Sequence, residues 1–228
     1  METLLHWIGF GLCHQLPERS YFGGGVQVPV CARDTGIYVG FAVGLAILAL
    51  LERGRRSSDA PPLLSGIALV GFIGMMALDG LTSYMGLRVT TNELRLFTGT
   101  LAGFALSAFT LPLLNGQLWV APGSGRVLPT ARQFGLFSLA AAGTTALVGL
   151  AGPAFGVAYP LTVGASILLT FTAVNLVIVC LLPWFERKAR RLRDAWVPVG
   201  IAFGLSIIEL AFSAALKNWM LVIAERVA

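Results

Sequence analysis

Long blocks of apolar residues alternate with short polar links along this chain of 228 residues. A helix that crosses a bilayer needs ~20 predominantly apolar residues, and the blocks approach or exceed that length. They predict six membrane-spanning helices near residues 36–51, 63–78, 92–119, 134–151, 157–184 and 196–224. Residues 2–12 predict a shorter helix in the membrane interface, with Leu5, Ile8 and Leu12 on its apolar face. We therefore expect an all-α fold, a polytopic membrane bundle with an interfacial N-terminal helix.

The composition supports the same fold class. Hydrophobic residues make up 56% of the chain, charged residues make up 12%, and the mean hydropathy is +0.80. A soluble domain carries about 25% charged residues, so this chain has too few to cover a water-exposed surface. No polar stretch is long enough for a second domain. Residues 1–228 are expected to form a single integral-membrane domain in contact with the lipid bilayer.

The basic residues predict how the chain is oriented in the membrane. Ten of the sixteen Lys and Arg residues lie in the links after the first, third and fifth predicted spans, within 52–62, 120–133 and 185–195. Links rich in Lys and Arg stay on the cytoplasmic side. This bias predicts that the three links lie in the cytoplasm and that both termini lie on the outer side of the membrane. The net charge of +5 reflects these links and does not indicate a nucleic-acid partner.

The strongest candidate chemistry lies in the motif segment 1–35, on the predicted outer face. Cys13, His14, Cys31 and Asp34 supply two thiols, an imidazole and a carboxylate, which are the groups that bind zinc. Cys31 and Asp34 are three residues apart, so one turn of backbone can present both to one ion. His6 is a reserve ligand. The pattern therefore predicts a metal site, with zinc as the candidate cofactor.

Two other interpretations of these residues stay open. In an oxidising outer compartment, Cys13 and Cys31 can form a disulfide instead of binding metal. Asp34 precedes the first predicted span and can serve simply as the cap of that helix.

A second polar group lies between the second and third predicted spans. Thr90 and Glu93 have capping-box spacing and predict a helix start. Arg88, Asn92 and Arg95 recur at three- and four-residue intervals, which places them on one helix face. Two guanidiniums at a helix start predict a site for an anion such as a phosphate group. The alternative is structural: Asp79 pairs with Arg95 and pins two helices, and Asp79 and Arg33 serve as helix-pairing or site-supporting residues.

Glu209 lies near the middle of the sixth predicted span. A carboxylate at that depth is costly and is treated as a functional candidate by default. It can face a water-filled cavity shared with Asn175 and Thr172, or pair with Arg95 or Lys217. The alternative is a hydrogen-bonded acid that holds two helices together.

The motifs of the first half of the chain resemble a known family. They are C-H-Q at Cys13, C-A-R-x-x-G-I-Y from Cys31, and D-G followed by R, N-x-L-R and T-G between Asp79 and Gly99. This pattern is similar to that of an uncharacterised family of small prokaryotic membrane proteins, the domain of unknown function 2085. The resemblance implies a fold and a location in the cytoplasmic membrane of a prokaryote, but no activity. Family members often carry a third cysteine where this chain has Asp34, which implies a harder and more water-accessible metal site here.

The sequence thus supports three hypotheses of function. The first is a metalloprotein whose outer-face site acts on an anionic substrate, such as a lipid head group or a small molecule. The second is a transporter that uses Glu209. The third is a structural or accessory subunit of a larger membrane complex, stapled by a Cys13–Cys31 disulfide and packed on membrane-protein partners. The chain holds no Walker loop, G-x-S-x-G elbow or H-E-x-x-H helix, so its sequence leaves open whether it is an enzyme.

Overall fold

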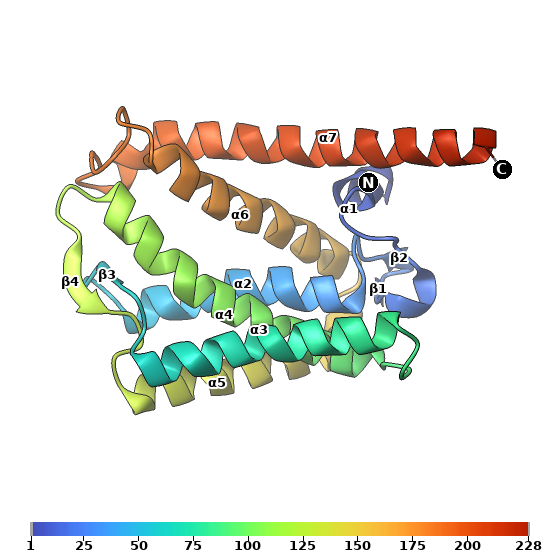
Figure 1. The fold of residues 1–228 in the computed structure, drawn as a ribbon, viewed down its shortest axis with the longest axis horizontal. Helices are drawn as coiled ribbons and strands as arrows, with labels where there is room; N and C mark the ends of the chain where they lie inside the picture. The colour runs from blue at the N-terminus through green and yellow to red at the C-terminus, as the bar shows by residue number, and fades with distance from the viewer. Residues whose placement is uncertain (1, 228) are drawn as a thin grey trace.

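The computed structural model describes residues 2–227, and α-helices dominate that range (Figure 1). The first and last residues of the predicted single domain, 1 and 228, lie outside the described residues. The helices are α1 (Glu2–Phe10), α2 (Ala32–Leu51), α3 (Leu63–Tyr84), α4 (Asn92–Leu118), α5 (Ala131–Ala146), α6 (Ala158–Cys180) and α7 (Trp196–Val227). The expected all-α polytopic bundle is confirmed.

Six helical segments of the described range are long and apolar enough to cross a membrane. They are Ala32–Leu51, Leu63–Tyr84, Asn92–Leu118, Ala131–Phe155, Ala158–Cys180 and Leu192–Glu225. The predicted spans lie at these positions, with shifts of a few residues at their ends. α2, the helix of the first predicted span, begins at Ala32, four residues before the predicted start at residue 36. Arg33 and Asp34 belong to its first turn. The fourth segment continues past Ala146 through a π turn, η2 (Leu147–Ala151), and a 3-10 turn, η3 (Gly152–Phe155).

Short paired strands lie in the links at the two ends of the bundle. β1 (Phe22–Gly23) and β2 (Val26–Gln27) form an antiparallel hairpin after the 3-10 turn η1 (Pro17–Arg19). β3 (Ser57–Asp59) pairs in parallel with β4 (Gly123–Arg126). Trp119 forms a further bridge with Ala189. The strands therefore tie together links that are distant in the sequence.

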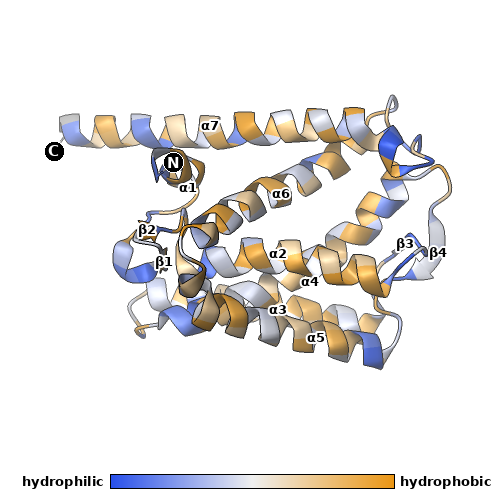
Figure 2. Cartoon of the chain, turned by 180° about the vertical axis from the view of Figure 1, so that it is seen from behind, coloured by the Kyte–Doolittle hydropathy of each residue, from blue (hydrophilic) through white to orange (hydrophobic). Residues whose placement is uncertain are grey.

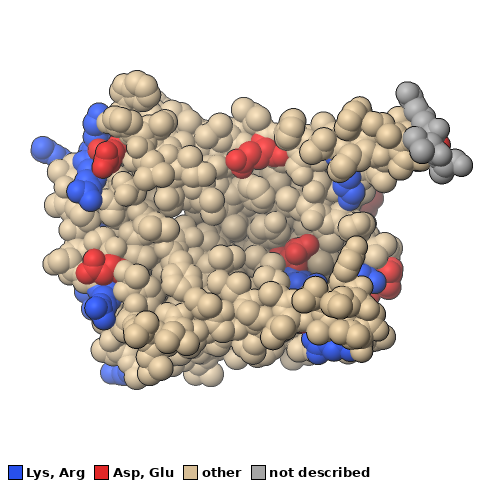
Figure 3. All heavy atoms as spheres, viewed as in Figure 1, with Lys and Arg blue, Asp and Glu red and all other residues tan. Residues whose placement is uncertain are grey.

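The links gather at two opposite ends of the molecule. The basic links that carry β3, β4 and the α6–α7 connection share one end, and α1, β1 and β2 lie at the other (Figure 1). Hydrophobic residues dominate the helices between these ends (Figure 2). On the face in Figure 3, Lys and Arg side chains gather toward the ends, while the middle is mainly uncharged. This arrangement matches a bundle that spans an apolar layer.

Glycines let α2 and α4, the most closely packed helix pair, approach each other. A methyl group on Gly99 would overlap the carbonyl oxygen of Arg33, and one on Gly103 would overlap that of Ile37. On the facing helix, a methyl group on Gly40 would lie 2.8 Å from the carbonyl oxygen of Thr100. Small residues at such crossings allow backbone-to-backbone packing in lipid. The crossing holds the start of α2 directly against the first turns of α4.

The last helix packs on the side of the bundle. α7 packs against α6, and against α1 near the end that carries the β1–β2 hairpin. The predicted apolar face of α1 has this role, since Leu5 is buried and Ile8 and Leu12 pack against a core cluster. Much of the surface of α7 is exposed and apolar, as expected for a helix that borders lipid.

Candidate functional site

Cys13, Cys31 and Asp34 meet at the end of the bundle that carries the hairpin. Their ligand atoms all lie within 4.8 Å of one another. The Cys31 thiol donates to Asp34 Oδ2 at 3.3 Å, and the Cys31 backbone N–H donates to Cys13 Sγ at the same distance. The ligands of a tetrahedral zinc ion stand roughly 3.3–3.8 Å apart, as bond lengths of 2.0–2.3 Å require. The three groups therefore need small movements to bind one ion.

Helix geometry places two of these groups together. Cys31 is the N-cap residue of α2, and Asp34 follows in the first helical turn. One turn of helix brings residues three apart onto the same face, so the thiol and the carboxylate lie side by side. No side-chain capping bond is formed at this helix start. Asp34 faces the thiol instead of capping α2.

Cys13 reaches the site through contacts from three parts of the chain. Gln15, which has a left-handed φ of 53°, donates to the carbonyl oxygens of His6 at 2.9 Å and Pro29 at 2.8 Å. The Lys217 ammonium on α7 donates to the carbonyl oxygens of Phe10 and Cys13, both at 2.7 Å. Sequence reasoning did not assign these roles to Gln15 or Lys217. The C-H-Q motif was the available signal for Gln15, whereas Lys217 showed none.

The two thiols are free and their acidities differ. Hydrogen bonding from the Cys31 thiol stabilises a thiolate at Cys13, and lowers the pKa of Cys13 to about 7 despite partial burial. The same hydrogen bond, followed by burial and the negative charge of Asp34, raises the pKa of Cys31. Cys13 is therefore the first of the pair to ionise, and a thiolate is the form that binds metal.

The structure separates His14 from the three clustered groups. His14 is exposed and is not among the side chains whose ligand atoms lie within 4.8 Å. It lines the adjoining cavity. His6, the reserve ligand, is exposed on α1, where its ring contacts Trp7 and Phe10. The cluster therefore has three ligands and one side that faces the cavity.

This cavity has a volume of about 320 Å³. Its walls carry the two thiols and Asp34, and three guanidiniums, those of Arg19, Arg33 and Arg95. The segment that follows α1, the start of α2, the end of α3 and the first turn of α4 all contribute to it. A cavity with both metal-binding groups and arginines can place an anion next to a cation.

Asp79 accepts hydrogen bonds from Arg33 and Arg88, and not from Arg95 as one interpretation of the sequence expected. The Asp79 residue is only 1% exposed, and its two oxygens face different arginines. Arg33 belongs to α2 and Arg88 to the α3–α4 turn, so the carboxylate on α3 joins three segments. The expected Asp79–Arg95 pair is absent from the described residues, because these two arginines occupy both carboxylate oxygens.

Arg95 lies one turn inside α4 and is buried, with 7% of its surface exposed. Its Nη1 donates to Asn92 Oδ1 at 3.1 Å, and Asn92 Nδ2 donates to the carbonyl oxygen of Glu18 at 3.2 Å. Asn92 thus links α4 to the 3-10 turn that carries Arg19. Thr91 caps α4 by accepting from the Leu94 N–H at 3.3 Å, one residue after the predicted Thr90. The helix begins at Asn92.

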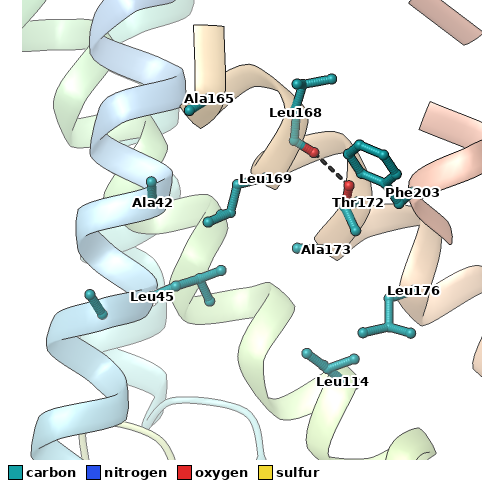
Figure 4. A pocket seen from close by; sticks show the side chains of 11 residues that line it. Ala42, Leu45, Leu114, Ala165, Leu168, Leu169, Thr172, Ala173, Leu176 and Phe203 are labelled. Carbon is teal, nitrogen blue, oxygen red and sulfur yellow. Dashed lines mark hydrogen bonds between the residues drawn. The ribbon is translucent and has the colours of Figure 1, made fainter. Parts of the chain in front are cut away.

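Glu209 belongs to a separate polar cluster between α6 and α7. Asn175 Nδ2 donates to Glu209 Oε2 at 2.8 Å and to Ser206 Oγ at 3.1 Å. Neither Arg95 nor Lys217, the two partners considered from the sequence, forms an ion pair with Glu209 in the described range. A neighbouring hollow of about 730 Å³ is lined almost entirely by Ala, Leu and Phe, with Thr172 as its polar side chain (Figure 4). The cluster joins two helices beside an apolar groove.

Comparisons with known proteins place the chain in a family. Residues 13–109 match the family described as "Predicted membrane protein (DUF2085)". An uncharacterized protein of Methanocaldococcus jannaschii is 40% identical over 108 residues, which are 47% of this chain and 67% of that protein. An uncharacterized protein of Methanothermobacter thermautotrophicus is 36% identical over 99 residues, 43% of this chain and 84% of that protein.

The chain therefore belongs to the DUF2085 family of membrane proteins, which confirms the resemblance in its first half. No solved structure matches it. Cys13, Cys31 and Asp34 form a thiol–carboxylate cluster, which lies within the matched region. The matched region also contains Asp79 and the arginines of the cavity. Glu209 and Asn175 lie beyond the matched region.

Proposed function

We propose that this protein is a metal-binding membrane protein in which Cys13, Cys31 and Asp34 hold a zinc-like ion. The observation that carries the proposal is the meeting of these three groups within 4.8 Å at the wall of a cavity. Three protein ligands with one open position are typical of zinc sites that act on substrates. Sites closed for structure alone have four protein ligands.

The ligand types favour zinc over harder cations. Two thiolates select borderline and soft metals, whereas Mg²⁺ and Ca²⁺ prefer sets made entirely of oxygen ligands. The carboxylate of Asp34 makes the set harder than one with three thiolates. The low pKa of Cys13, about 7, supplies one thiolate near neutral pH.

The fourth position faces the cavity. Water or a substrate atom can occupy it, and His14, which is exposed and lines the same cavity, is the protein group that can reach it by moving. Zinc lowers the pKa of bound water to about 7, so an open position would supply a hydroxide for hydrolysis. In that case the protein is an enzyme, and its substrate enters the cavity that Arg19 and Arg95 line.

We place this site on the outer side of the membrane. The support is the charge of the opposite end, where the links rich in arginine gather (Figure 1). Cysteine-accessibility labelling in sealed vesicles tests this placement. A thiol probe that cannot cross the membrane should reach a cysteine introduced at Gln27 from outside, and one introduced at Arg190 from inside. Labelling of both positions from the same side would overturn it.

Metal analysis of the purified protein tests the metal site. We expect about one zinc per chain in the wild type. Cys13→Ser, Cys31→Ser and Asp34→Asn should each lower the zinc content. Cys180→Ala is the matched control, because Cys180 is a thiol buried in α6 away from the site. With cobalt in place of zinc, thiolate-to-metal absorption should appear in the wild type and disappear in Cys31→Ser.

A protein without bound metal would contradict the proposal. A wild-type protein that binds no stoichiometric metal, and whose Cys13 and Cys31 resist alkylation until they are reduced, contains a disulfide staple. That result favours an accessory subunit of a membrane complex over a metalloprotein. Metal binding that is unchanged in Cys31→Ser and Asp34→Asn would place the ion elsewhere.

The transporter hypothesis receives less support than the metal site. Its key residue, Glu209, is hydrogen-bonded to Asn175, and the nearby hollow is apolar (Figure 4). Such a groove gives a charged solute few polar partners. Loss of substrate flux in Glu209→Gln vesicles with normal protein content would favour transport.

A further inference from the structure

We propose that Arg95 and Arg19 form a binding site for a phosphate-type oxyanion in the cavity beside the thiol–carboxylate cluster. This inference goes beyond the metal site and does not depend on it. The sequence indicated Arg88 and Arg95 as the anion-binding arginines. In the structure Arg19, and not Arg88, lines the cavity together with Arg95.

The charge of Arg95 has no acidic partner among the described residues. Its side chain is part of the cavity wall and is 7% exposed. Its side chain donates to the neutral Asn92. A charge buried without a counter-ion is costly, and the cost is removed when an anion binds. This guanidinium is thus a preformed half of an anion site.

The carboxylates near Arg95 are already engaged by other groups. Arg33 and Arg88 already occupy the two oxygens of Asp79. Asp34 is the carboxylate in the cavity wall, and it faces the Cys31 thiol. Arg88 belongs to the Asp79 network, with 44% of its side chain exposed, and it is absent from the cavity wall. The cavity therefore keeps an excess of positive charge.

Asn92 connects the two segments that carry Arg19 and Arg95. Asn92 accepts from Arg95 and donates to the Glu18 carbonyl, next to Arg19 in the chain. One amide therefore fixes the position of α4 relative to the turn that carries Arg19. Arg19 is exposed and lines the same cavity, so it forms the accessible side of the site. Asn92 is a positioning residue in this arrangement, not a ligand.

The guanidiniums and the neighbouring cluster favour a phosphate-type ligand. Two guanidiniums present several N–H donors in planar forks, which match the oxygens of a phosphate better than those of a halide. Cys13, Cys31 and Asp34 also line this cavity, so one part of it attracts anions and another attracts cations. A phosphate monoester fits this polarity. It can belong to a lipid head group or to a free phosphate, and the two arms of the binding experiment separate these sources.

The test measures binding to the purified full-length protein in a nonionic detergent with a metal chelator present. Inorganic phosphate is titrated by calorimetry in one arm. In the other arm, the protein is placed in nanodiscs of phosphatidylcholine with or without phosphatidic acid, and lipid retention is measured by native mass spectrometry. Binding in the first arm identifies a site open to free phosphate. Binding confined to the second arm identifies a site for lipid head groups.

The variants decide whether the arginines are responsible. Arg19→Gln should weaken binding about tenfold, the loss of one charge-assisted interaction, and Arg95→Gln about 100-fold. Arg132→Gln is the matched control, because Arg132 is exposed at the other end of the molecule. If Arg95→Gln does not fold, Arg19→Gln still tests the site at an exposed position. Asn92→Ala should also weaken binding, and its effect should disappear in the Arg95→Gln background.

Asp34→Asn separates this inference from the metal proposal. It should remove metal binding and leave phosphate binding in the presence of chelator equal or stronger, because a repelling carboxylate is neutralised. Phosphate binding that appears only when zinc replaces the chelator, and that disappears in Asp34→Asn, would mean that a metal holds the anion, and would overturn the arginine site. The arginine site is also overturned if wild-type protein binds neither probe, or if Arg19→Gln and Arg132→Gln weaken binding equally.

Discussion

The ammonium group of Lys217 donates to the carbonyl oxygen of Cys13 at 2.7 Å, although 204 positions separate the two residues. Lys217 also bonds the Phe10 carbonyl, and Ser213 Oγ donates to the Gly11 carbonyl at 3.0 Å. α7 therefore fixes the loop that carries the first thiol of the site. The last helix, which lies outside the region matched by the family, has a direct role in shaping the site.

This contact predicts that Lys217→Met loosens the Cys13 loop. A hydrogen bond to a charged group contributes roughly 1.5–3 kcal/mol, so the variant should melt at a lower temperature and bind zinc about tenfold more weakly. Lys188→Met is the control, since Lys188 is exposed in a link at the other end. Fluorescence-detected thermal unfolding and competitive zinc titration provide the measurements. Unchanged zinc affinity in Lys217→Met would show that α7 does not position Cys13.

Asp79→Asn should be among the most destabilising polar substitutions. It leaves Arg33 and Arg88 without their shared counter-ion, and breaking a buried ion pair costs about 3 kcal/mol or more. Asp59→Asn is the control, because Asp59 is exposed. The measurement is the midpoint of thermal unfolding in detergent. Equal midpoints for the two variants would contradict the structural role of Asp79.

Gly99→Ala should separate α2 from α4 at the level of the site. The new methyl group overlaps the Arg33 carbonyl, and overpacking of this kind costs about 1–3 kcal/mol. We expect lower stability together with weaker zinc binding, because Arg33 lies between the ligands Cys31 and Asp34 at the start of α2. Gly200→Ala on α7 meets no neighbour within 4 Å and should be neutral or slightly stabilising. If both variants behave alike, the crossing does not control the site.

The pKa of Cys13 predicts how its alkylation depends on pH. In metal-free protein the thiolate fraction should rise as pH increases through about 7, because the pKa is lowered to about 7 by hydrogen bonding from Cys31. Iodoacetamide labelling of Cys13, measured by mass spectrometry, should therefore slow down below pH 7. Cys31 should react more slowly across this range, since its pKa is raised. In Cys31→Ala the midpoint for Cys13 should move upward, and an unmoved midpoint would refute the assigned cause.

Glu209 substitutions test whether this residue joins two helices. Glu209→Gln keeps an oxygen that can accept from Asn175, so it should stay within about 1 kcal/mol of the wild-type stability. Glu209→Leu loses that acceptor and leaves the Asn175 amide with fewer partners, so it should lower the unfolding temperature. Thermal unfolding of the two variants provides the comparison. Equal stability of wild type and Glu209→Leu would show that the hydrogen bond does not hold α6 and α7 together.

The sequence by itself determined the fold class and the positions of the long apolar helices. Six apolar blocks allow few alternatives, since only helices satisfy the backbone groups of single spans in lipid. The start of α4 at Asn92 was also readable, because a threonine cap leaves a local signal, although the cap is Thr91 instead of Thr90. The neighbouring placement of Cys31 and Asp34 follows from helix periodicity alone.

The tertiary structure decided which distant groups meet. Whether Cys13 approaches Cys31 depends on Gln15 and on Lys217, and no local pattern records contacts across 14 or 204 positions. The partners of Asp79 were expected from nearness in sequence, yet Arg33 is 46 residues away and reaches Asp79 through the glycine crossing of α2 and α4. Local patterns reflect backbone geometry over a few residues. Pairing between helices depends on how they pack, and so the unpaired Arg95 became visible only in the folded bundle.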